Sequence, residues 1–190
     1  MKEKDVKIVA FVGMSGSGKS VAVDYMTAKG IPKVYFGGMI YKEMERRGIE
    51  RTADGKSEKE FREMIRETEG KDWVVRQVID EVYDLVSAGQ KRIVLDGVYS
   101  WTEYKTLKRE FPGVITFVAV VVPKKLRYKR VSERPDRPFA LEEIRERDRS
   151  EIENLEKGGP IAAADYYILN EGSVAEMHEK IVGILKEIQF

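Results

Sequence analysis

The stretch Gly13-Met14-Ser15-Gly16-Ser17-Gly18-Lys19-Ser20 decides the fold of this 190-residue chain. An apolar run, residues 6–12, precedes it, and a helix-compatible segment, residues 21–29, follows it. Glycines at these positions let successive backbone N–H groups turn inward around an anion, because glycine tolerates backbone angles that other residues resist. A helix that begins near Gly18 directs its positive end and its unpaired N–H groups at the same anion. The stretch therefore predicts a phosphate-binding loop between a strand and a helix.

Two side chains of this loop predict the chemistry of its ligand. Lys19 adds a point charge for the β- and γ-phosphates of a nucleotide, and Ser20 offers a hydroxyl to Mg²⁺. ATP with Mg²⁺ is the expected cofactor, GTP stays open as the donor, and we expect the lysine head to reach solvent without a ligand. A glycine-rich turn that binds nothing is the alternative, but strand, loop, lysine, serine and helix are all in register. The residues expected to hold the nucleotide here are Gly13, Met14, Ser15, Gly16, Ser17, Gly18, Lys19 and Ser20.

Length and composition predict one globular domain, residues 1–190. Hydrophobic residues make up 42% of the chain and charged residues 35%, and a net charge of +1 gives no general attraction to nucleic acid or membranes. Because the chain has no cysteine, disulfides and thiolate metal sites are excluded. The charged first residues are unlike a signal peptide, and the longest apolar stretch, residues 114–122, is too short to cross a bilayer. We expect a cytoplasmic protein, either monomer or homodimer.

Apolar runs alternate with helical patterns along the chain, which predicts an α/β fold of three layers: a five-stranded parallel sheet with helices on both faces. The expected strands are residues 7–12, 33–36, 92–96, 115–122 and 166–169. Several are continuous apolar runs, as expected for strands that are buried on both faces. Ser57, Ser100 and Ser173 each precede a glutamate by three residues, which predicts a capping box at the start of three helices.

Two regions do not fit this alternation of strands and helices. Residues 37–90 contain three expected helices, and residues 124–159 are dense in charge and interrupted by Pro135 and Pro138. In a phosphate-binding protein of this size, the first region is expected to cover an acceptor. The second is expected to close over the nucleotide.

Asp96 ends an expected strand and is followed by Gly97. The carboxyl ends of parallel strands face the ligand crevice, so this carboxylate is expected beside the loop, where it holds Mg²⁺ or orients the acceptor. A simple turn is the alternative. Asn170 and Gly172 follow the last strand, and they either line the base of a nucleotide or form a plain turn.

Arginines are concentrated in the second region, at positions 127, 130, 134, 137, 145, 147 and 149. Phosphoryl transfer needs guanidinium groups that neutralise the charge on the migrating phosphate. Arg130, Arg134 and Arg147 are the expected catalytic arginines, together with Lys19 and Asp96. The alternative is a solvated surface whose arginines are neutralised by nearby acids.

The loop, the Asp96-Gly97 pair, the arginine-rich region and the ending 162–173 (Ala-Ala-Ala-Asp-Tyr-Tyr-Ile-Leu-Asn-Glu-Gly-Ser) resemble the nucleoside monophosphate kinase group of P-loop proteins. The resemblance covers nearly the whole chain and is nearest to a branch related to adenylate kinase and dephospho-CoA kinase. It implies a P-loop NTPase fold with an acceptor-binding helical insertion at residues 37–90 and an arginine-rich lid at residues 124–159. It also implies a phosphotransferase that depends on ATP and Mg²⁺.

The acceptor side departs from this family. Such kinases have aspartate where Gly38 stands, and they have arginines where Tyr41 and Tyr99 stand. Gly38, Tyr41 and Tyr99 are therefore expected at an altered acceptor site. An acceptor phosphate would need other cations, such as Lys42, Arg46 or Arg62.

The expected function is an ATP-dependent small-molecule kinase whose acceptor is a nucleotide, a nucleoside or an alcohol like dephospho-CoA. The missing arginines leave a second hypothesis open, a nucleotide-binding protein or slow ATPase without kinase activity. A polynucleotide kinase is a third hypothesis, which the near-neutral charge disfavours.

Overall fold

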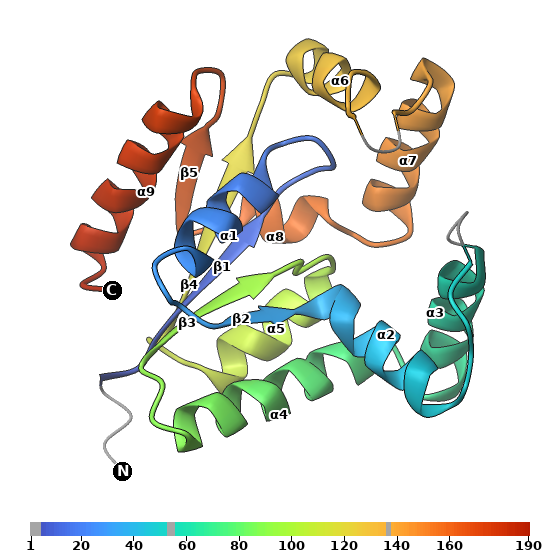
Figure 1. The fold of residues 1–190 in the computed structure, drawn as a ribbon, viewed down its shortest axis with the longest axis horizontal. Coiled ribbons are helices and arrows are strands. Elements are labelled where there is room, and N and C mark those ends of the chain that lie inside the picture. Colours follow the sequence, from blue (N-terminus) through green and yellow to red (C-terminus); the bar gives the residue numbers. More distant parts are fainter. Residues whose placement is uncertain (1–4, 53–55, 136–137) are drawn as a thin grey trace.

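The computed structural model describes residues 5–52, 56–135 and 138–190, and its centre is a single parallel sheet (Figure 1). The strands are β1 (Lys7–Val12), β2 (Lys33–Tyr35), β3 (Arg92–Asp96), β4 (Ile115–Val121) and β5 (Tyr166–Leu169). They lie in the order β2-β3-β1-β4-β5, and every pairing is parallel. The five expected strands are confirmed, although β2 and β4 each end one residue before the apolar run does.

Alternate residues of the central strand β1 contact two different helical layers. Ile8, Ala10 and Val12 belong to a core shared with α4 (Trp73–Ser87) and α5 (Trp101–Glu110), and α8 (Gly158–Ala162) packs on the same side. Val9 and Phe11 belong to a core shared with α1 (Lys19–Thr27) and α9 (Val174–Glu187). Each fully buried aliphatic or phenylalanine side chain contributes roughly 1.5–3 kcal/mol. This double burial explains the continuous apolar runs and confirms the three-layer fold.

Two helices extend from the sheet between β2 and α4. They are α2 (Phe36–Arg46) and α3 (Lys56–Thr68), and they share a small core of their own, formed by Ile40, Met44, Phe61 and Ile65. The described part of residues 37–90 contains helices and no strand, as expected.

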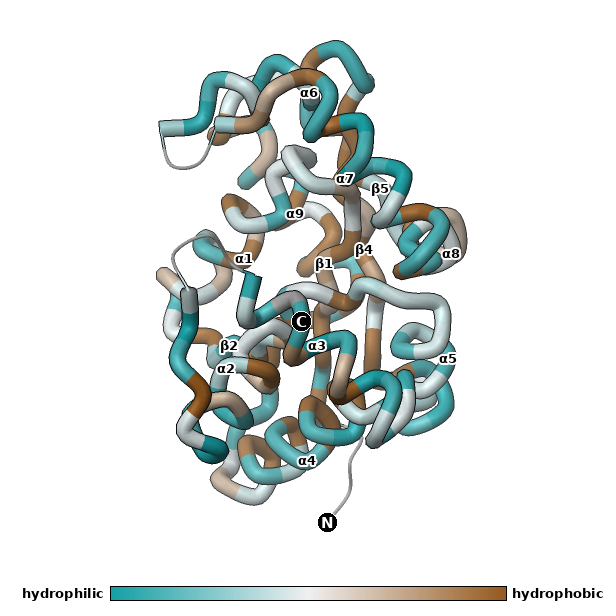
Figure 2. Tube along the Cα trace, turned by 90° about the vertical axis from the view of Figure 1, so that its right-hand side faces the viewer, coloured by the Kyte–Doolittle hydropathy of each residue, from teal (hydrophilic) through white to brown (hydrophobic). Residues whose placement is uncertain are grey.

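Two further helices follow β4 and lie beyond the carboxyl end of the sheet (Figure 1). They are α6 (Lys124–Ser132) and α7 (Leu141–Glu153). Figure 2 shows mostly hydrophilic colour along α6 and hydrophobic colour along β1 and β4. Both helices contact the loop after β1, because Arg127 of α6 donates to the Ser15 carbonyl and Glu151 of α7 accepts from the Ser15 N–H.

Helix starts are partly as expected. The hydroxyls of Ser100 and Ser173 accept hydrogen bonds from the N–H groups three residues later, and both capping boxes are complete. The capping box at Ser57 is wrong, because α3 begins one residue earlier and Ser57 exchanges two hydrogen bonds with Thr52 instead. None of the helices in the described residues is both long and apolar enough to cross a membrane.

Candidate active site

The carboxyl ends of β1 and β3 border a cavity of about 570 Å³, here called the loop cavity. The parallel register pairs Phe11 of β1 with Asp96 of β3, so the loop after β1 and this carboxylate are brought together. The predicted residues that line the loop cavity are Ser15, Gly16, Gly18, Lys19, Ser20, Asp96, Tyr99, Arg130, Arg134 and Arg147. Residues far apart in the sequence thus meet at one end of the sheet, as the parallel fold requires.

The loop after β1 needs its glycines. Gly16 and Gly18 adopt φ values of 84° and 98°, which other residues rarely adopt. A Cβ at Gly16 would lie 2.4 Å from Val131 Cγ2, and one at Gly18 would lie 2.3 Å from Asn170 Nδ2. The segments that carry Val131 and Asn170 therefore pack closely against the loop and hold it in this shape.

Asn170 supports the loop but is not among the described residues that line the loop cavity. It is buried, and its Nδ2 donates to the Ser17 carbonyl at 2.9 Å. Its own carbonyl accepts from Arg130 Nη1 at 2.8 Å, so it also links the loop to α6. Gly172 is exposed in front of α9, and nucleotide contacts by either residue stay a prediction.

The head of Lys19 lines the loop cavity as expected, but it is only partly open to solvent. Its Nζ donates to the carbonyls of Gly13 at 2.6 Å and Met14 at 3.2 Å, so it folds back onto the loop. Burial, helped by the nearby Lys157, lowers the pKa of Lys19 to about 7. Carbonyl oxygens satisfy the hydrogen bonds of the ammonium group but not its charge, which an anion would stabilise.

Asp96 is half-buried at the end of β3. Burial raises the pKa of its carboxyl group, while Lys33 and Lys19 oppose this rise. Lys33 lines the loop cavity too, and the sequence analysis did not identify it. Asp96 therefore shares the loop cavity with two cations and with Ser20, which lies at the start of α1.

The arginines in and between α6 and α7 differ in what they contact. Arg127 is buried and forms a two-bonded ion pair with Asp148, and its Nη1 also donates to the Ser15 carbonyl at 3.0 Å. Burial lowers the pKa of Arg127 but is outweighed by Asp148, so the arginine stays charged and holds α6, α7 and the loop together. Arg130, Arg134 and Arg147 instead line the loop cavity, as expected for arginines that contact phosphate. Arg137 lies outside the described residues.

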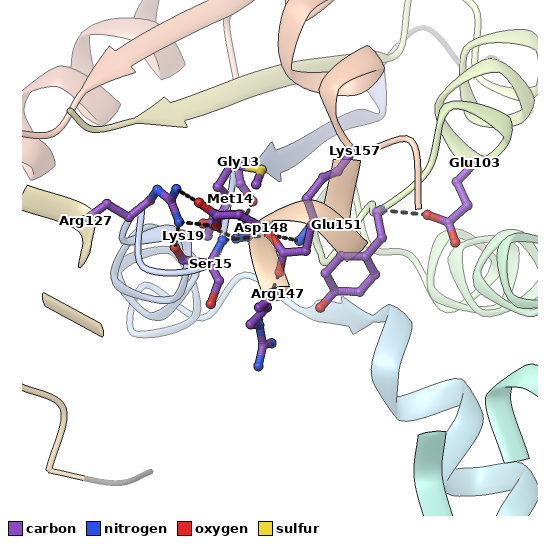
Figure 3. A network of polar contacts seen from close by, with 11 residues as sticks. Gly13, Met14, Ser15, Lys19, Glu103, Arg127, Arg147, Asp148, Glu151 and Lys157 are labelled. Carbon is purple, nitrogen blue, oxygen red and sulfur yellow. Dashed lines mark hydrogen bonds and ion pairs between the residues drawn. The ribbon is translucent and has the colours of Figure 1, made fainter. Parts of the chain in front are cut away.

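Glu151 and Lys157 lie at the loop, and the sequence analysis missed both. Figure 3 shows the carboxylate of Glu151 among Ser15, Arg147 and Lys157. Lys157 is 2% exposed and forms an ion pair with Glu151 at 3.0 Å. In a region so rich in charge, no sequence signal separates these two residues from solvated neighbours.

A second cavity, of about 230 Å³, adjoins the first and is here called the tyrosine cavity. Tyr35, Tyr41 and Tyr99 line it, as do Arg62 and Arg66 of α3 and Lys71. Five described residues line both cavities: Tyr35, Tyr99, Arg147, Glu151 and Lys157. The two cavities therefore share a wall.

The expected acceptor residues are only partly at this cavity. Tyr41 and Tyr99 line it, whereas Gly38 does not. The neighbouring Gly37 lines the cavity instead, and both glycines pack against the Tyr35 ring. Of the cations expected to compensate for the missing arginines, Arg62 faces the tyrosine cavity. Lys42 and Arg46 do not line it, and they pair with Glu81 and Glu43 on the surface. Arg66 and Lys71 were not identified from the sequence.

The tyrosines act as neutral hydrogen-bonding groups. Burial and then Tyr41 raise the pKa of Tyr35 to about 12, and burial raises the pKa of Tyr99 still further. Their hydroxyls stay protonated at neutral pH and add no negative charge to the cavity. Its positive charge comes from Arg62 and Arg66 of α3, Lys71 and Arg147.

Comparisons with known proteins show the family of the chain. The model of a family described as an AAA domain matches residues 9–154. A UPF0200 protein of Thermococcus kodakarensis is 34% identical over 184 residues, which cover 95% of this chain and 97% of that protein. The chain belongs to this AAA domain family and to the UPF0200 proteins. A UPF0200/UPF0201 protein of Archaeoglobus fulgidus is 33% identical over 188 residues, and the chain spans 56% of the length of that relative.

Solved structures extend the likeness to the fold. The protein TT1252 of Thermus thermophilus superposes with a TM-score of 0.68 at 18% identity, over 96% of this chain and 97% of that one. A dephospho-CoA kinase of Campylobacter jejuni superposes with a TM-score of 0.56 at 17% identity, over 97% of this chain and 98% of that one. The resemblance to P-loop kinases is confirmed in the fold.

The residues present fit a nucleotide with Mg²⁺. The glycine cradle and Lys19 suit phosphate oxygens. No group of three or more histidine, cysteine or acidic side chains in the described residues could hold a metal ion. Mg²⁺ needs no such group, because it keeps several waters and is held by one or two protein oxygens together with phosphates. Ser20 and Asp96, the oxygen ligands expected for Mg²⁺, both line the loop cavity.

Proposed function

We propose that this protein is an ATP- and Mg²⁺-dependent phosphotransferase that acts on a small acceptor carrying a negative charge. The observation that carries the proposal is the shared wall between two cavities, one built on a phosphate-type loop and one lined by cations. Transfer requires donor and acceptor in line and close together, with charge stabilisation between them. Arg147 lines both cavities, so its guanidinium group is placed to stabilise charge between donor and acceptor.

On the donor side, the loop amides and Lys19 hold the phosphates, and Ser20 and Asp96 hold Mg²⁺. When bound, Mg²⁺ neutralises oxygens of the β- and γ-phosphates. Arg130, Arg134 and Arg147 stabilise the charge on the transferring group. Asp96, whose pKa is raised by burial, is also placed to orient an acceptor hydroxyl.

On the acceptor side, the charges favour an anion. Arg62 and Arg66 line the tyrosine cavity, and neither forms an ion pair with a described carboxylate. A nucleotide or a phosphate-bearing alcohol such as dephospho-CoA supplies the missing charge, whereas a neutral nucleoside does not. The fold shared with a dephospho-CoA kinase supports including that alcohol. No nucleic acid or membrane partner is proposed, monomer and homodimer stay open, and the absence of cysteine supports a cytoplasmic location.

The test is a transfer assay with ATP labelled in the γ-phosphate. Nucleoside monophosphates, nucleosides and dephospho-CoA are offered singly, with Mg²⁺ and with excess EDTA. We expect labelled product from at least one anionic acceptor, only with Mg²⁺. Release of labelled inorganic phosphate at one slow rate, whatever acceptor is added, would instead favour the second hypothesis, a nucleotide-binding slow ATPase.

A further inference from the structure

Glu151 places an acidic side chain where the loop would otherwise bind phosphate. Its Oε2 accepts a hydrogen bond from Ser15 N–H at 3.0 Å and pairs with Lys157 Nζ at 3.0 Å. Its Oε1 accepts from Arg147 Nε at 3.4 Å (Figure 3). A backbone amide of a glycine loop, a lysine and an arginine are the donors that suit a phosphate oxygen. The carboxylate therefore uses donors that a nucleotide needs.

Lys157 depends on this carboxylate. It is almost fully buried, and Glu151 is the carboxylate that pairs with it among the described residues. Its Nζ also lies 4.8 Å from the centre of the Tyr99 ring. A buried ammonium group without an anion is strongly unfavourable, so Lys157 needs Glu151 or a replacement for it.

The carboxylate is held in place by the packing of α6 and α7 on the loop. Arg127 binds Asp148 of α7 and donates to the carbonyl of Ser15. The N–H and the carbonyl of Ser15 are thus both bonded to residues from these helices, one to Glu151 and the other to Arg127. The first half of the loop is covered by side chains of the chain's own lid region.

We propose that Glu151 is a built-in substitute for a nucleotide phosphate, and that Lys157 exchanges its carboxylate for a phosphate when a nucleotide binds. A carboxylate and a phosphate oxygen cannot share Ser15 N–H and Lys157, because like charges at such short distance repel each other. Nucleotide binding therefore displaces Glu151. Lys157, which lines both cavities, becomes a further phosphate-binding residue between donor and acceptor. This inference rests on the nucleotide binding in the proposed function, but not on phosphoryl transfer.

The first experiment compares Glu151→Gln with Glu146→Gln. Both variants remove one negative charge from α7, but Glu146 is exposed and lines neither cavity. Calorimetric titration with ATP, with and without Mg²⁺, and with pyrophosphate measures the affinity. We expect Glu151→Gln to bind both ligands at least tenfold more tightly than wild type, because no ion pair must be broken, and Glu146→Gln to bind them as wild type does. Affinity of Glu151→Gln equal to or below wild type would overturn the inference.

The second experiment tests the exchange by Lys157. Lys157→Gln is made in the Glu151→Gln background, and thermal unfolding without ligand shows that the double variant is folded. If Lys157 binds phosphate, the double variant binds ATP at least tenfold more weakly than Glu151→Gln alone. If Lys157 only neutralises Glu151, the two affinities are equal and the inference fails. Lys157→Met, which keeps the apolar stem, replaces Lys157→Gln if the latter does not fold.

These outcomes separate the inference from the proposed function. Tight ATP binding by wild type with no change in Glu151→Gln overturns the inference alone. Tighter binding by Glu151→Gln without transfer to any acceptor supports the inference and contradicts the proposed function. Absence of ATP binding by wild type and by all variants contradicts both.

Discussion

The loop cavity and the tyrosine cavity differ in how their positive charges are balanced. At the loop, two buried cations are already paired inside the protein: Arg127 with Asp148 and Lys157 with Glu151. At the tyrosine cavity, Arg62 and Arg66 have no described carboxylate as a partner. The loop side therefore has to exchange an internal anion for a ligand, whereas the acceptor side has charge ready for one.

The two cavities also differ in what builds them. The loop is one continuous stretch whose backbone amides and glycines do the binding, and it is anchored on the central strand. The tyrosine cavity is assembled from side chains of several elements, among them α2, α3, α7 and the segment after β3, and α2 and α3 share a small core of their own. A site made of backbone tolerates little change, while a site made of side chains on a separate unit is free to change its ligand.

The largest effect is expected for ATP binding at the loop cavity. Lys19→Ala should weaken ATP binding by about 100-fold or more, because the point charge for the phosphates is lost. Stability should change by less than about 1 kcal/mol, since the buried ammonium group costs free energy that its hydrogen bonds to two carbonyls offset. Calorimetry and urea unfolding measure the two quantities. Lys29→Ala, in the exposed turn after α1, is the control. Unchanged ATP binding by Lys19→Ala would remove the basis for a donor site.

The next effect concerns the tyrosine cavity. Arg62→Ala and Arg66→Ala should each lower kcat/KM for the anionic acceptor roughly 10- to 100-fold, since a charge-assisted hydrogen bond contributes about 1.5–3 kcal/mol. ATP affinity should stay within about twofold of wild type, because these residues do not line the loop cavity. Arg46→Ala removes an arginine that is paired on the surface and should have no effect. An equal loss of ATP affinity in both α3 variants would show that the two cavities are one site.

A smaller effect is expected from the glycine that packs under Tyr35. In Gly37→Ala the new Cβ would lie 2.5 Å from Tyr35 Cζ and Oη, so the tip of the ring must move. Because this ring lines the tyrosine cavity, acceptor KM should rise about three- to tenfold, while stability changes by less than about 1 kcal/mol. Steady-state kinetics and thermal unfolding measure both. The control is Gly183→Ala in α9, which meets nothing within 4 Å and should stabilise the protein by about 0.5–1 kcal/mol. An acceptor KM that does not change would mean that Tyr35 does not shape the site.

The smallest effect tests the surface of α2. The hydrogen bond from Arg46, helped by Arg47 and opposed by slight burial, lowers the pKa of Glu43 to about 2. Since the folded-state pKa lies below the unfolded value, the ion pairs stabilise the fold above about pH 4.5 and lose this contribution as the pH falls toward 2. Glu43→Gln should cost less than about 1 kcal/mol at pH 7, because exposed pairs contribute little. Urea unfolding at pH 7, 5 and 3.5 should show the difference from wild type shrinking. Glu45→Gln, exposed on the same helix, is the control, and a difference that grows toward low pH would contradict this sign.

Much of the fold could be predicted from the sequence because its signals are local. The strands are continuous apolar runs, and the loop has glycines at positions where φ is positive. The place of Asp96 followed from a general property of parallel sheets, whose carboxyl ends share one edge. The capping boxes at Ser100 and Ser173 needed only residues three apart. The signal at Ser57 misled because Ser57 lies inside α3, where its side chain and its N–H group bond to Thr52.

The charged residues of α7 could not be assigned in this way. Helical periodicity places Arg147 and Glu151 on the same side of a helix, but it does not say whether that side meets solvent or the loop. For the same reason Arg66 and Lys71, which line the tyrosine cavity, looked no different from solvated neighbours.

The residue order was sufficient for the phosphate-type loop, the parallel sheet and the carboxylate at its edge, because these depend on backbone geometry and on apolar burial close to each residue. The packing of α6 and α7 onto the loop settled which arginine pairs internally, and it placed Glu151 and Lys157 at the loop. Such assignments depend on contacts between residues more than one hundred positions apart, where a charge is buried only if a partner arrives from elsewhere in the fold.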